Sequence, residues 1–420
     1  MEYIVINGQK QLKGSVVISG AKNAAVAILP AAMAANGICV IDNLPSIKDI
    51  ASLTKAIESL GATCKVIDPN TLVIDSTKVN SHCLDDNIAK HTRASYYFMG
   101  ALLGRFKKAE VPLPGGCDLG ARPIDYHLKG FVALGATCVQ EHGVVKIHAE
   151  KLTGANIYLD CPSVGATINI MIAAVFAEGV TLIENVAKEP HVVDTANFLN
   201  KLGAKISGAG TDAIRITGVE SLGGGEYTVI PDQIEAGTYM IASAITCGDV
   251  TVENIIPKHM DSLTSKLKEM GCETEEGGDW IRVIGKKGLR PSEIRTAYYP
   301  GFPTDLQPQM TTLLCTAHGT SLVTENIFEN RFRYIGELKR LGGQIKVEGR
   351  TAITKGFCEL TGAKVISSDL RAGAALIIAA LAAKGETMIG GLKHLDRGYE
   401  RFEEKLRSLG ADIKRVTEEE

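Results

Sequence analysis

The sequence predicts an α/β protein built from six copies of one β-α-β-α-β-β unit, and two observations support this. First, a helix-like segment ends in a closely similar phrase six times, at intervals of about 70 residues. The six phrases are ESLGATCKV, VALGATCVQ, NKLGAKISG, KEMGCETEE, KRLGGQIKV and RSLGADIKR. Second, the same series of elements surrounds each phrase. We therefore expect one supersecondary unit used six times.

Each predicted unit starts with an apolar, alanine-rich helix that ends at a glycine and leads into a strand, as in AAVFAEGVTLIENV. An amphipathic helix such as DSLTSKLKEMG follows, and then a hairpin such as CETEEGGDWIRVIG. The sixth hairpin, ADIKRVTEEE, lacks its return strand, and EYIVING near the N-terminus resembles the return strands of other units. We therefore expect two lobes of three units each, residues 22–229 and residues 1–21 plus 230–420.

The composition argues against several classes of function. The chain has 420 residues, 45% of them hydrophobic, and a formal net charge of −3. We therefore expect neither nucleic acid nor a membrane surface as a partner. The start MEYIVINGQKQLKG does not have the pattern of a secretory signal, and the run AAVAILPAAMAANGICVI is broken by Pro30, Asn36 and Gly37. The ten cysteines form no CxxC pair and no cluster with zinc-ligand spacing. We expect reduced thiols, a cytoplasmic location and no metal.

Cys117 stands in a loop rich in glycine and proline, PLPGGCDLGARP. Free cysteines are usually buried, whereas glycine and proline mark exposed turns. The second unit, which contains this loop, is about seven residues longer than the others between its first helix and its shared phrase. Because long loops often carry chemistry, we expect a functional insertion around Cys117.

The starts of the six alanine-rich helices indicate a site for an anion. They read SGAKNAA, HTRASYY, PSVGATI, IEAGTYM, PTDLQPQ and SSDLRAG. Helix N-termini present free N–H groups and a partial positive charge. If the internal symmetry directs these ends toward one cleft, Lys22, Arg93, Ser163 and Arg371 meet there. Such a site suits a ligand with more than one phosphate or carboxylate.

Several motifs, in order along the chain, resemble those of the UDP-N-acetylglucosamine 1-carboxyvinyltransferase family. They are SGAKNAA, PGGCDLGARP, SVGAT, FPTDLQPQ, ENRF, SDLRAGAAL and DRGYERFEEKLRSLGA, so the similarity runs from the first strand to the last helix. The resemblance implies the inside-out α/β barrel of enolpyruvyl transferases, with two lobes of three units and the active site in the cleft between them. The fold alone does not decide the function, because sibling transferases share it.

The resemblance implies transfer of the enolpyruvyl group of phosphoenolpyruvate to the 3-hydroxyl of UDP-N-acetylglucosamine, with release of phosphate by addition and elimination. This reaction is the first committed step of peptidoglycan synthesis, and therefore of cell-wall biogenesis, and it uses no cofactor. Cys117 matches the general acid, which can also form an adduct with the pyruvyl carbon. Arg122 is near enough in sequence to stabilise its thiolate. Asp305 matches the residue that accepts the hydroxyl proton.

Other positions match residues that bind the two substrates. Lys22, Arg122 and Arg397 match the cations that hold phosphoenolpyruvate and complete the catalytic set with Cys117 and Asp305; Arg331 and Arg371 lie close to the same ligand. Asn23 matches a hydrogen-bonding partner of the sugar. The nucleotide-sugar contacts correspond to Arg93, Arg122, Pro123, Ile124, Asp125, Tyr126, Ser163, Val164, Gly165 and Ile327. Asp369 lies at a helix start, where capping explains it as well as catalysis does. Cys161 departs from the family, because some members have a basic residue there.

Three other functions were weighed. The sibling enzyme that acts on shikimate 3-phosphate shares the repeated fold but uses no such cysteine loop. A non-catalytic paralogue that binds the nucleotide sugar is disfavoured because Cys117, Asp305, Lys22 and Arg397 are all present. A thiol hydrolase needs a histidine base, and His127 has no orienting partner by motif. The oligomeric state and the choice between two paralogues stay open.

Overall fold

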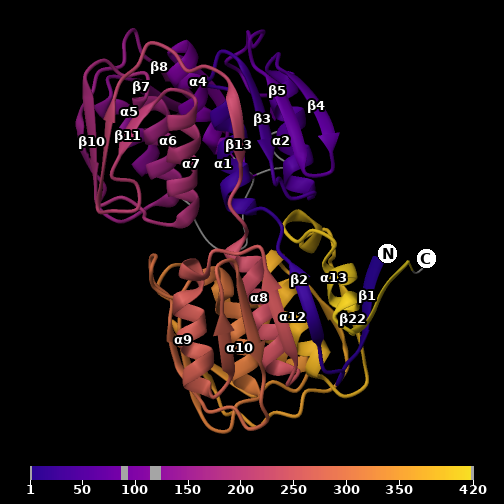
Figure 1. Cartoon of the computed structure of the whole chain (residues 1–420). Helices are drawn as coiled ribbons and strands as arrows, with labels where there is room; N and C mark the ends of the chain where they lie inside the picture. The colour runs from indigo at the N-terminus through magenta and orange to yellow at the C-terminus, as the bar shows by residue number, and fades with distance from the viewer. Residues whose placement is uncertain (1, 87–92, 114–123, 418–420) are drawn as a thin grey trace. The chain divides into compact units, whose positions relative to one another are not determined.

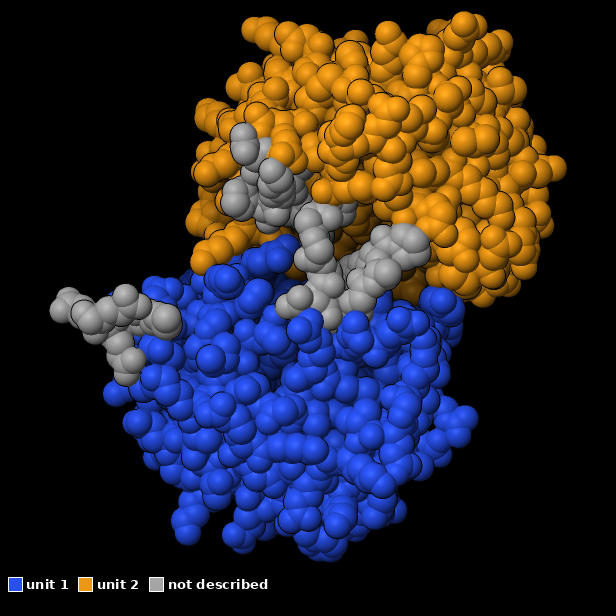
Figure 2. All heavy atoms as spheres, turned by 180° about the vertical axis from the view of Figure 1, so that it is seen from behind, with its two compact units in different colours: residues 1–19, 118–120, 231–420 blue, residues 20–117, 121–230 orange. Residues whose placement is uncertain are grey.

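The computed structural model describes residues 2–86, 93–113 and 124–417. Within these ranges the chain forms two compact units (Figure 2). Unit 1 contains residues 2–19 and 231–417, and unit 2 contains the described residues from 20 to 230. The chain therefore passes from unit 1 to unit 2 after Ser19 and returns after Ile230. Each unit has its own hydrophobic core.

The described part of unit 2 contains three sheets, with strand orders β13-β3-β5-β4, β11-β12-β10-β9 and β6-β8-β7 (Figure 1). The strands are β3 (Ile38–Asp42), β4 (Thr63–Asp68), β5 (Thr71–Asp75), β6 (Lys108–Pro112), β7 (Thr137–Glu141), β8 (Val144–His148), β9 (Asn156–Tyr158), β10 (Val180–Glu184), β11 (Lys205–Ser207), β12 (Ala213–Thr217) and β13 (Gly225–Thr228). The helices are α1 (Lys22–Ala32), α2 (Lys48–Ser59), the 3-10 helix η1 (Arg93–Tyr97), α4 (Phe98–Phe106), α5 (Asp125–Ala133), α6 (Val164–Ala174) and α7 (Pro190–Lys201).

The described part of unit 1 also contains three sheets, with orders β21-β22-β1-β23, β15-β16-β14-β2 and β17-β18-β20-β19. The strands are β1 (Glu2–Asn7), β2 (Lys13–Val17), β14 (Asp249–Glu253), β15 (Glu273–Glu276), β16 (Trp280–Ile284), β17 (Glu293–Arg295), β18 (Ser321–Thr324), β19 (Ile345–Glu348), β20 (Thr351–Thr354), β21 (Lys364–Ile366), β22 (Glu386–Gly390) and β23 (Asp412–Thr417). The α-helices are α8 (Gln233–Ile245), α9 (Asp261–Met270), α10 (Gln307–Cys315), α11 (Ile335–Arg340), α12 (Leu370–Ala382) and α13 (Phe402–Ser408). Four 3-10 helices, η2 (Pro257–Met260), η3 (Thr304–Leu306), η4 (Arg331–Tyr334) and η5 (Leu395–Arg397), complete the unit.

Strand β1 lies between β22 and β23 and pairs antiparallel with both, through Ile4↔Ile389 and Ile6↔Ile413 for example. The N-terminal segment therefore supplies the return strand that the last hairpin lacks, as the resemblance of EYIVING to other return strands predicted. Figure 1 shows the two ends of the chain in this part of unit 1.

The six copies of the shared phrase have the same backbone conformation at their glycine. Its six glycines all adopt a left-handed conformation, with φ between +95° and +109°; they are Gly61, Gly135, Gly203, Gly271, Gly342 and Gly410. A glycine in this conformation directly after a helix ends it and reverses the chain, because a side chain would be strained there. At each phrase the chain therefore leaves an amphipathic helix and enters the hairpin that follows it.

The alanine-rich helices form the interior of each unit. Residues on all faces of α6 and α12 are buried, and α1 and α8 are buried along nearly their whole length. A helix that is apolar all round belongs in a core, and the alternating burial of strands such as β12 places one sheet face against that core. The structure thereby confirms the inside-out α/β fold class. None of the described helices has the length and apolar character needed to cross a membrane.

Two buried carboxylates hold the chain where it leaves each unit. Asp194 of α7 accepts hydrogen bonds from the Tyr227 hydroxyl at 2.5 Å and from the Ile230 N–H at 3.3 Å. In unit 1, Glu235 of α8 accepts from the Ser19 N–H at 3.0 Å and from the Lys405 ammonium at 2.6 Å. Burial raises the pKa of Asp194 to about 6 and that of Glu235 to about 7.

The raised pKa of Asp194 makes the stability of unit 2 depend on pH. Between about pH 4, where an unfolded aspartate titrates, and about pH 6, the folded protein binds more protons than the unfolded chain, so the free energy of unfolding falls as pH rises. We expect Asp194→Asn to remove this fall, which amounts to ~3 kcal/mol for two pKa units. Urea unfolding followed by circular dichroism at several pH values measures it.

Tyr227→Phe is the matched control for this prediction. It keeps the carboxyl group but removes a hydrogen bond that lowers the pKa of Asp194, so the fall of stability with pH should become larger. The fluorescence of Trp280, the single tryptophan of the chain, reports unit 1 and separates its unfolding from that of unit 2. An Asp194→Asn variant with the same pH dependence as the parent protein would contradict the prediction.

Candidate functional site

Asp305 binds two buried arginines in unit 1. It lies in η3, directly before α10. Its Oδ1 is 2.9 Å from Nη2 of Arg331, and its Oδ2 is 3.0 Å from Nη2 of Arg371. The side chains of Arg331 and Arg371 are only 2% and 5% exposed, against 26% for Asp305. The structure thus brings three of the predicted site residues into one ion-pair cluster, held between the starts of η4, α10 and α12.

Arg371 is fixed from several sides. It is the second residue of α12, and its guanidinium lies over the ring of Tyr399 at 5.5 Å from the ring centre. Burial lowers the pKa of Arg371, but the charge of and hydrogen bond to Asp305, together with Tyr399 and Asp232, outweigh burial and raise the pKa above its ordinary value. The side chain is therefore a permanent cation in an apolar setting.

Asp369 is the N-cap of the same helix. Its Oδ1 accepts from the backbone N–H groups of Arg371 at 2.9 Å and Ala372 at 3.0 Å. This contact is the capping role that the sequence allowed for it. Asp369 therefore positions the helix start that carries Arg371.

Glu325 is a residue that the sequence reasoning missed. It follows β18, is 1% exposed, and its two carboxylate oxygens accept hydrogen bonds from the hydroxyls of Thr296 and Thr304 at 2.9 and 3.0 Å. Its Oε1 also accepts from the backbone N–H groups of Ile327 and Phe328 at 2.8 and 3.0 Å. Glu325 thereby ties the residue before Asp305 to the segment that carries Ile327. The only local signal was an acid at the end of a buried strand.

Arg397 is the last residue of η5 and is partly buried. It stands two residues before Tyr399, whose hydroxyl is 2.9 Å from that of Thr238 and accepts a hydrogen bond from Gln309 at 3.3 Å. These contacts link the segment of Arg397 to helices α8 and α10.

In unit 2, Lys22 is the first residue of α1 and forms an ion pair with Asp49, in the first turn of α2. The Lys22 Nζ is 3.0 Å from Oδ2 of Asp49, and the two side chains are 14% and 6% exposed. Asn23 follows at the second position of α1 and is partly buried. The sequence reasoning did not include Asp49, which orients the ammonium group of Lys22.

Two helix starts bring together the other described candidates of unit 2. Ile124 precedes α5, which begins with Asp125 and Tyr126. Ser163 caps α6 by accepting from the Ala166 N–H at 3.4 Å, and Val164 and Gly165 begin that helix. A Cβ atom on Gly165 would lie 3.1 Å from the rings of both His127 and Tyr96, so glycine permits the close approach of α5 and α6.

Tyr126 and Cys161 interact beside these helix starts. The interaction with Cys161 raises the pKa of Tyr126 to about 12. Cys161 is the position where some members of the resembled family have a basic residue. Here that place is taken by a thiol that contacts a candidate substrate-binding tyrosine.

His127 has an orienting partner that no motif indicated. Its Nδ1 is 3.0 Å from Nδ2 of Asn169, whose Oδ1 accepts from the Gly100 N–H at 2.8 Å. His127 is 6% exposed, and burial lowers its pKa to about 3. This neutral side chain joins α5 to α6, and its burial argues against the role of an active-site base that a thiol hydrolase would need.

Three predicted site residues, Cys117, Arg122 and Pro123, lie outside the described residues. Arg93 begins η1, and only its backbone is described. The described candidates thus fall into two groups, one in each unit, and Lys22, Asp305 and Arg371 lie at or directly before the starts of buried helices. Cations at such positions suit phosphate and carboxylate ligands.

Comparisons with known proteins show the family and the fold. The family model for EPSP synthase (3-phosphoshikimate 1-carboxyvinyltransferase) matches residues 6–406. The enolpyruvyl transferase NikO from Streptomyces tendae has a similar structure, with a TM-score of 0.90, 27% sequence identity, and coverage of 100% of this chain and 99% of NikO. An EPSP synthase from Acinetobacter baumannii shares the fold, with a TM-score of 0.75 and 20% identity over 99% of this chain and 100% of that one. The family match and the fold therefore identify the chain as an enolpyruvyl transferase.

A relative from Clostridium acetobutylicum, UDP-N-acetylglucosamine 1-carboxyvinyltransferase 2, is 57% identical over 416 residues, with 99% of each chain covered. The chain belongs to the UDP-N-acetylglucosamine 1-carboxyvinyltransferase family, as the sequence motifs indicated. This level of identity does not favour the shikimate enzyme as an alternative.

The ion-pair cluster predicts a stability effect. Asp305→Ala should lower the free energy of unfolding of unit 1 by ~3–5 kcal/mol, because it leaves two buried guanidinium groups without their shared anion. Asp249→Ala is the control, since the Asp249–Arg282 pair is half-exposed and its loss should cost ~1 kcal/mol or less. Urea unfolding followed by Trp280 fluorescence measures both. Equal losses for the two variants would contradict the prediction.

Proposed function

We propose that this protein transfers the enolpyruvyl group of phosphoenolpyruvate to the 3-hydroxyl of UDP-N-acetylglucosamine, releasing phosphate. The transfer would be the first committed step of peptidoglycan synthesis. The observation that carries the proposal is the family membership together with the cluster of Asp305, Arg331 and Arg371 at the matching motif positions. The described cysteines are free thiols, in keeping with a reducing cytoplasm as the site of the reaction.

In the proposed reaction, Asp305 is the base. The carboxylate of Asp305 is positioned by its ion pairs with Arg331 and Arg371 and accepts the proton of the 3-hydroxyl. The 3-hydroxyl proton moves to Asp305 as the sugar oxygen bonds to the central carbon of phosphoenolpyruvate, and Cys117 protonates the methylene carbon. Elimination then returns a proton from the new methyl group to the Cys117 thiolate, which restores the double bond and breaks the bond to phosphate, and the phosphate leaves with the proton held by Asp305. Glu325 supports this step by holding Thr304 next to Asp305.

The cations are proposed to divide between the substrates. Lys22, Arg122 and Arg397 hold the phosphate and carboxylate of phosphoenolpyruvate, with Arg331 and Arg371 close by. Asp49 presents the ammonium group of Lys22 and reduces the cost of its partial burial until the substrate arrives. The nucleotide sugar contacts Asn23, Arg93, Ile327 and the starts of α5 and α6, where Ser163 and Tyr126 offer hydroxyl groups.

For the proposed reaction, the first prediction concerns the thiol. Cys117→Ala should fold normally and lose turnover by ~10²–10⁴-fold, the usual contribution of a general acid. Phosphate release from phosphoenolpyruvate and UDP-N-acetylglucosamine measures turnover, and an epoxide phosphonate that resembles phosphoenolpyruvate should alkylate Cys117 in the parent protein. Peptide mapping that finds the label on Cys138 or Cys161 instead would refute the assignment. Absence of phosphate release from the parent protein would instead indicate a non-catalytic nucleotide-sugar-binding protein.

The second prediction concerns the division of the cations. Lys22→Ala and Arg397→Ala should raise the KM for phosphoenolpyruvate far more than they weaken binding of UDP-N-acetylglucosamine, since each removes a charge-assisted contact to the smaller substrate. Arg93→Ala should do the reverse. Steady-state kinetics and calorimetric titration with the nucleotide sugar measure the two effects. Equal losses for both substrates in all three variants would contradict this division of roles.

A further inference from the structure

The sheet formed by β6, β8 and β7 differs from the five other described sheets. In each of those, a short strand pairs parallel with the strand that follows a buried helix, as β9 does with β10. Here the corresponding segment makes a single parallel bridge, Cys83↔Glu110. The parallel strand of this unit is thus reduced to one bridge, and it carries the residues His82 and Cys83.

Backbone hydrogen bonds on both sides of the bridge fix these residues against β6. The Glu110 N–H donates to the carbonyl of His82 at 2.9 Å, and the Leu84 N–H donates to the carbonyl of Glu110 at 2.9 Å. The Cys83 N–H also donates to the Ser81 hydroxyl at 3.2 Å. The positions of His82, Cys83 and Glu110 are therefore set by the sheet and not by flexible side chains.

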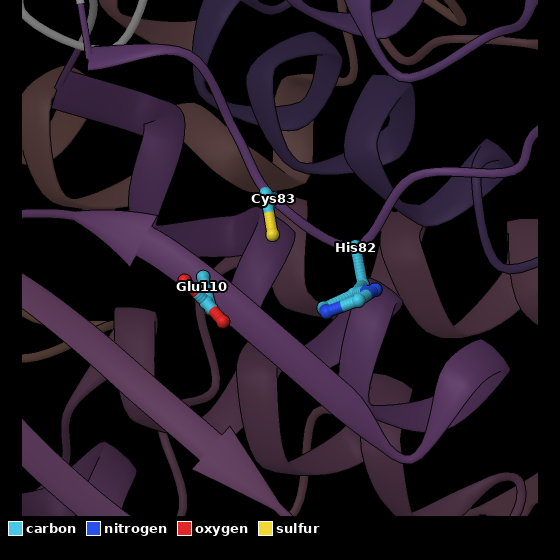
Figure 3. Close-up of side chains that lie close together, drawn as sticks. All are labelled: His82, Cys83 and Glu110. Atoms are coloured by element: carbon cyan, nitrogen blue, oxygen red, sulfur yellow. The ribbon is translucent and has the colours of Figure 1, made fainter.

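The three side chains converge. Figure 3 shows them directed toward one another, Glu110 from β6 and the other two from the adjacent segment. One ligand atom of each, an imidazole nitrogen, the thiol sulfur and a carboxylate oxygen, lies within 4.8 Å of the others. In a tetrahedral zinc site, bonds of ~2.0–2.3 Å keep the ligand atoms roughly 3.5 Å apart. Small side-chain rotations would bring this group to that spacing.

The geometry points to a binding site for a zinc-like divalent cation formed by His82, Cys83 and Glu110, with water completing the coordination. Thiolate and imidazole ligands together select zinc or a similar borderline ion over magnesium or calcium. On binding, the sulfur–metal bond forms and the thiol proton leaves to solvent. The spacing of the cysteines in the sequence does not indicate this site, because Glu110 lies beside the other two residues only in the folded sheet.

The fold itself does not require this combination of residues. The equivalent bridge joins the third residue of the strand after the buried helix to its parallel neighbour in all five other described sheets. Those pairs are Val40↔Glu226, Leu182↔Asn156, Thr251↔Ser15, Val323↔Ile294 and Met388↔Lys364. Among these and Cys83↔Glu110, only the last joins two metal-ligating side chains next to a histidine.

A positively charged residue lies opposite Glu110 in the sheet. Lys146 of β8 pairs with Glu110 in the antiparallel register and is exposed. Its ammonium group competes with a cation for the carboxylate, so Lys146→Met should leave zinc binding equal or tighter. A bound metal would link the segment of His82 and Cys83, which precedes Arg93, to strand β6, which precedes Cys117. The proposed metal site does not depend on the proposed reaction.

The test uses the full chain with Cys117→Ala, so that the candidate catalytic thiol does not bind the metal. Zn²⁺ should bind with one-to-one stoichiometry by calorimetry. Co²⁺ should give a thiolate-to-cobalt charge-transfer band in the near ultraviolet. In this background, Cys83→Ser should abolish the band, and His82→Gln and Glu110→Gln should each weaken Zn²⁺ binding ~10-fold or more.

Cys138→Ser is the matched control, because Cys138 lies in β7 of the same sheet and should leave both signals unchanged. Circular dichroism shows that each variant is folded. A charge-transfer band that persists in Cys83→Ser, Zn²⁺ affinity that is unchanged in Glu110→Gln, or loss of binding in Lys146→Met would overturn the proposal.

Discussion

The six glycines that end the amphipathic helices are the constraint on which the fold depends. Each adopts a left-handed conformation that costs other residues ~1–2 kcal/mol. Because the chain reverses there, each hairpin returns beside the strand of its own unit and covers the helix that precedes it. Repeating this turn six times places the alanine-rich helices inside and the sheets outside. Each of the two units has its own core built in this way.

The burial of the alanine-rich helices also decides where polar chemistry can occur. Their sides are apolar, so the charged candidates gather at their N-terminal ends: Lys22 on α1, Asp305 before α10 and Arg371 on α12. At these ends the charges are largely removed from water, and each has a partner. Asp305 serves two arginines and Asp49 serves Lys22. Electrostatic attraction to an anionic substrate is stronger in such a setting than at an exposed surface.

The positions of the supporting residues explain why part of the site could not be predicted. Asp305, Lys22 and Arg371 belong to short motifs at helix starts, so the sequence alone identified them. Glu325 and Asp49 act on residues that other elements carry, and nothing in their own surroundings in the sequence indicates those partners. Asn169 contacts His127 from a different helix and was missed for the same reason.

The repeat, the order of the elements, the fold class and the family could be predicted from the sequence. These follow from local patterns: a glycine that must be left-handed, helical and strand periodicity, and motifs of a few residues. The pairing of the charges, the capping of α12 by Asp369 and the meeting of His82 and Cys83 with Glu110 became known from the three-dimensional arrangement. Such contacts depend on which strand edges and helix ends come together, and residue spacing along one chain does not encode that.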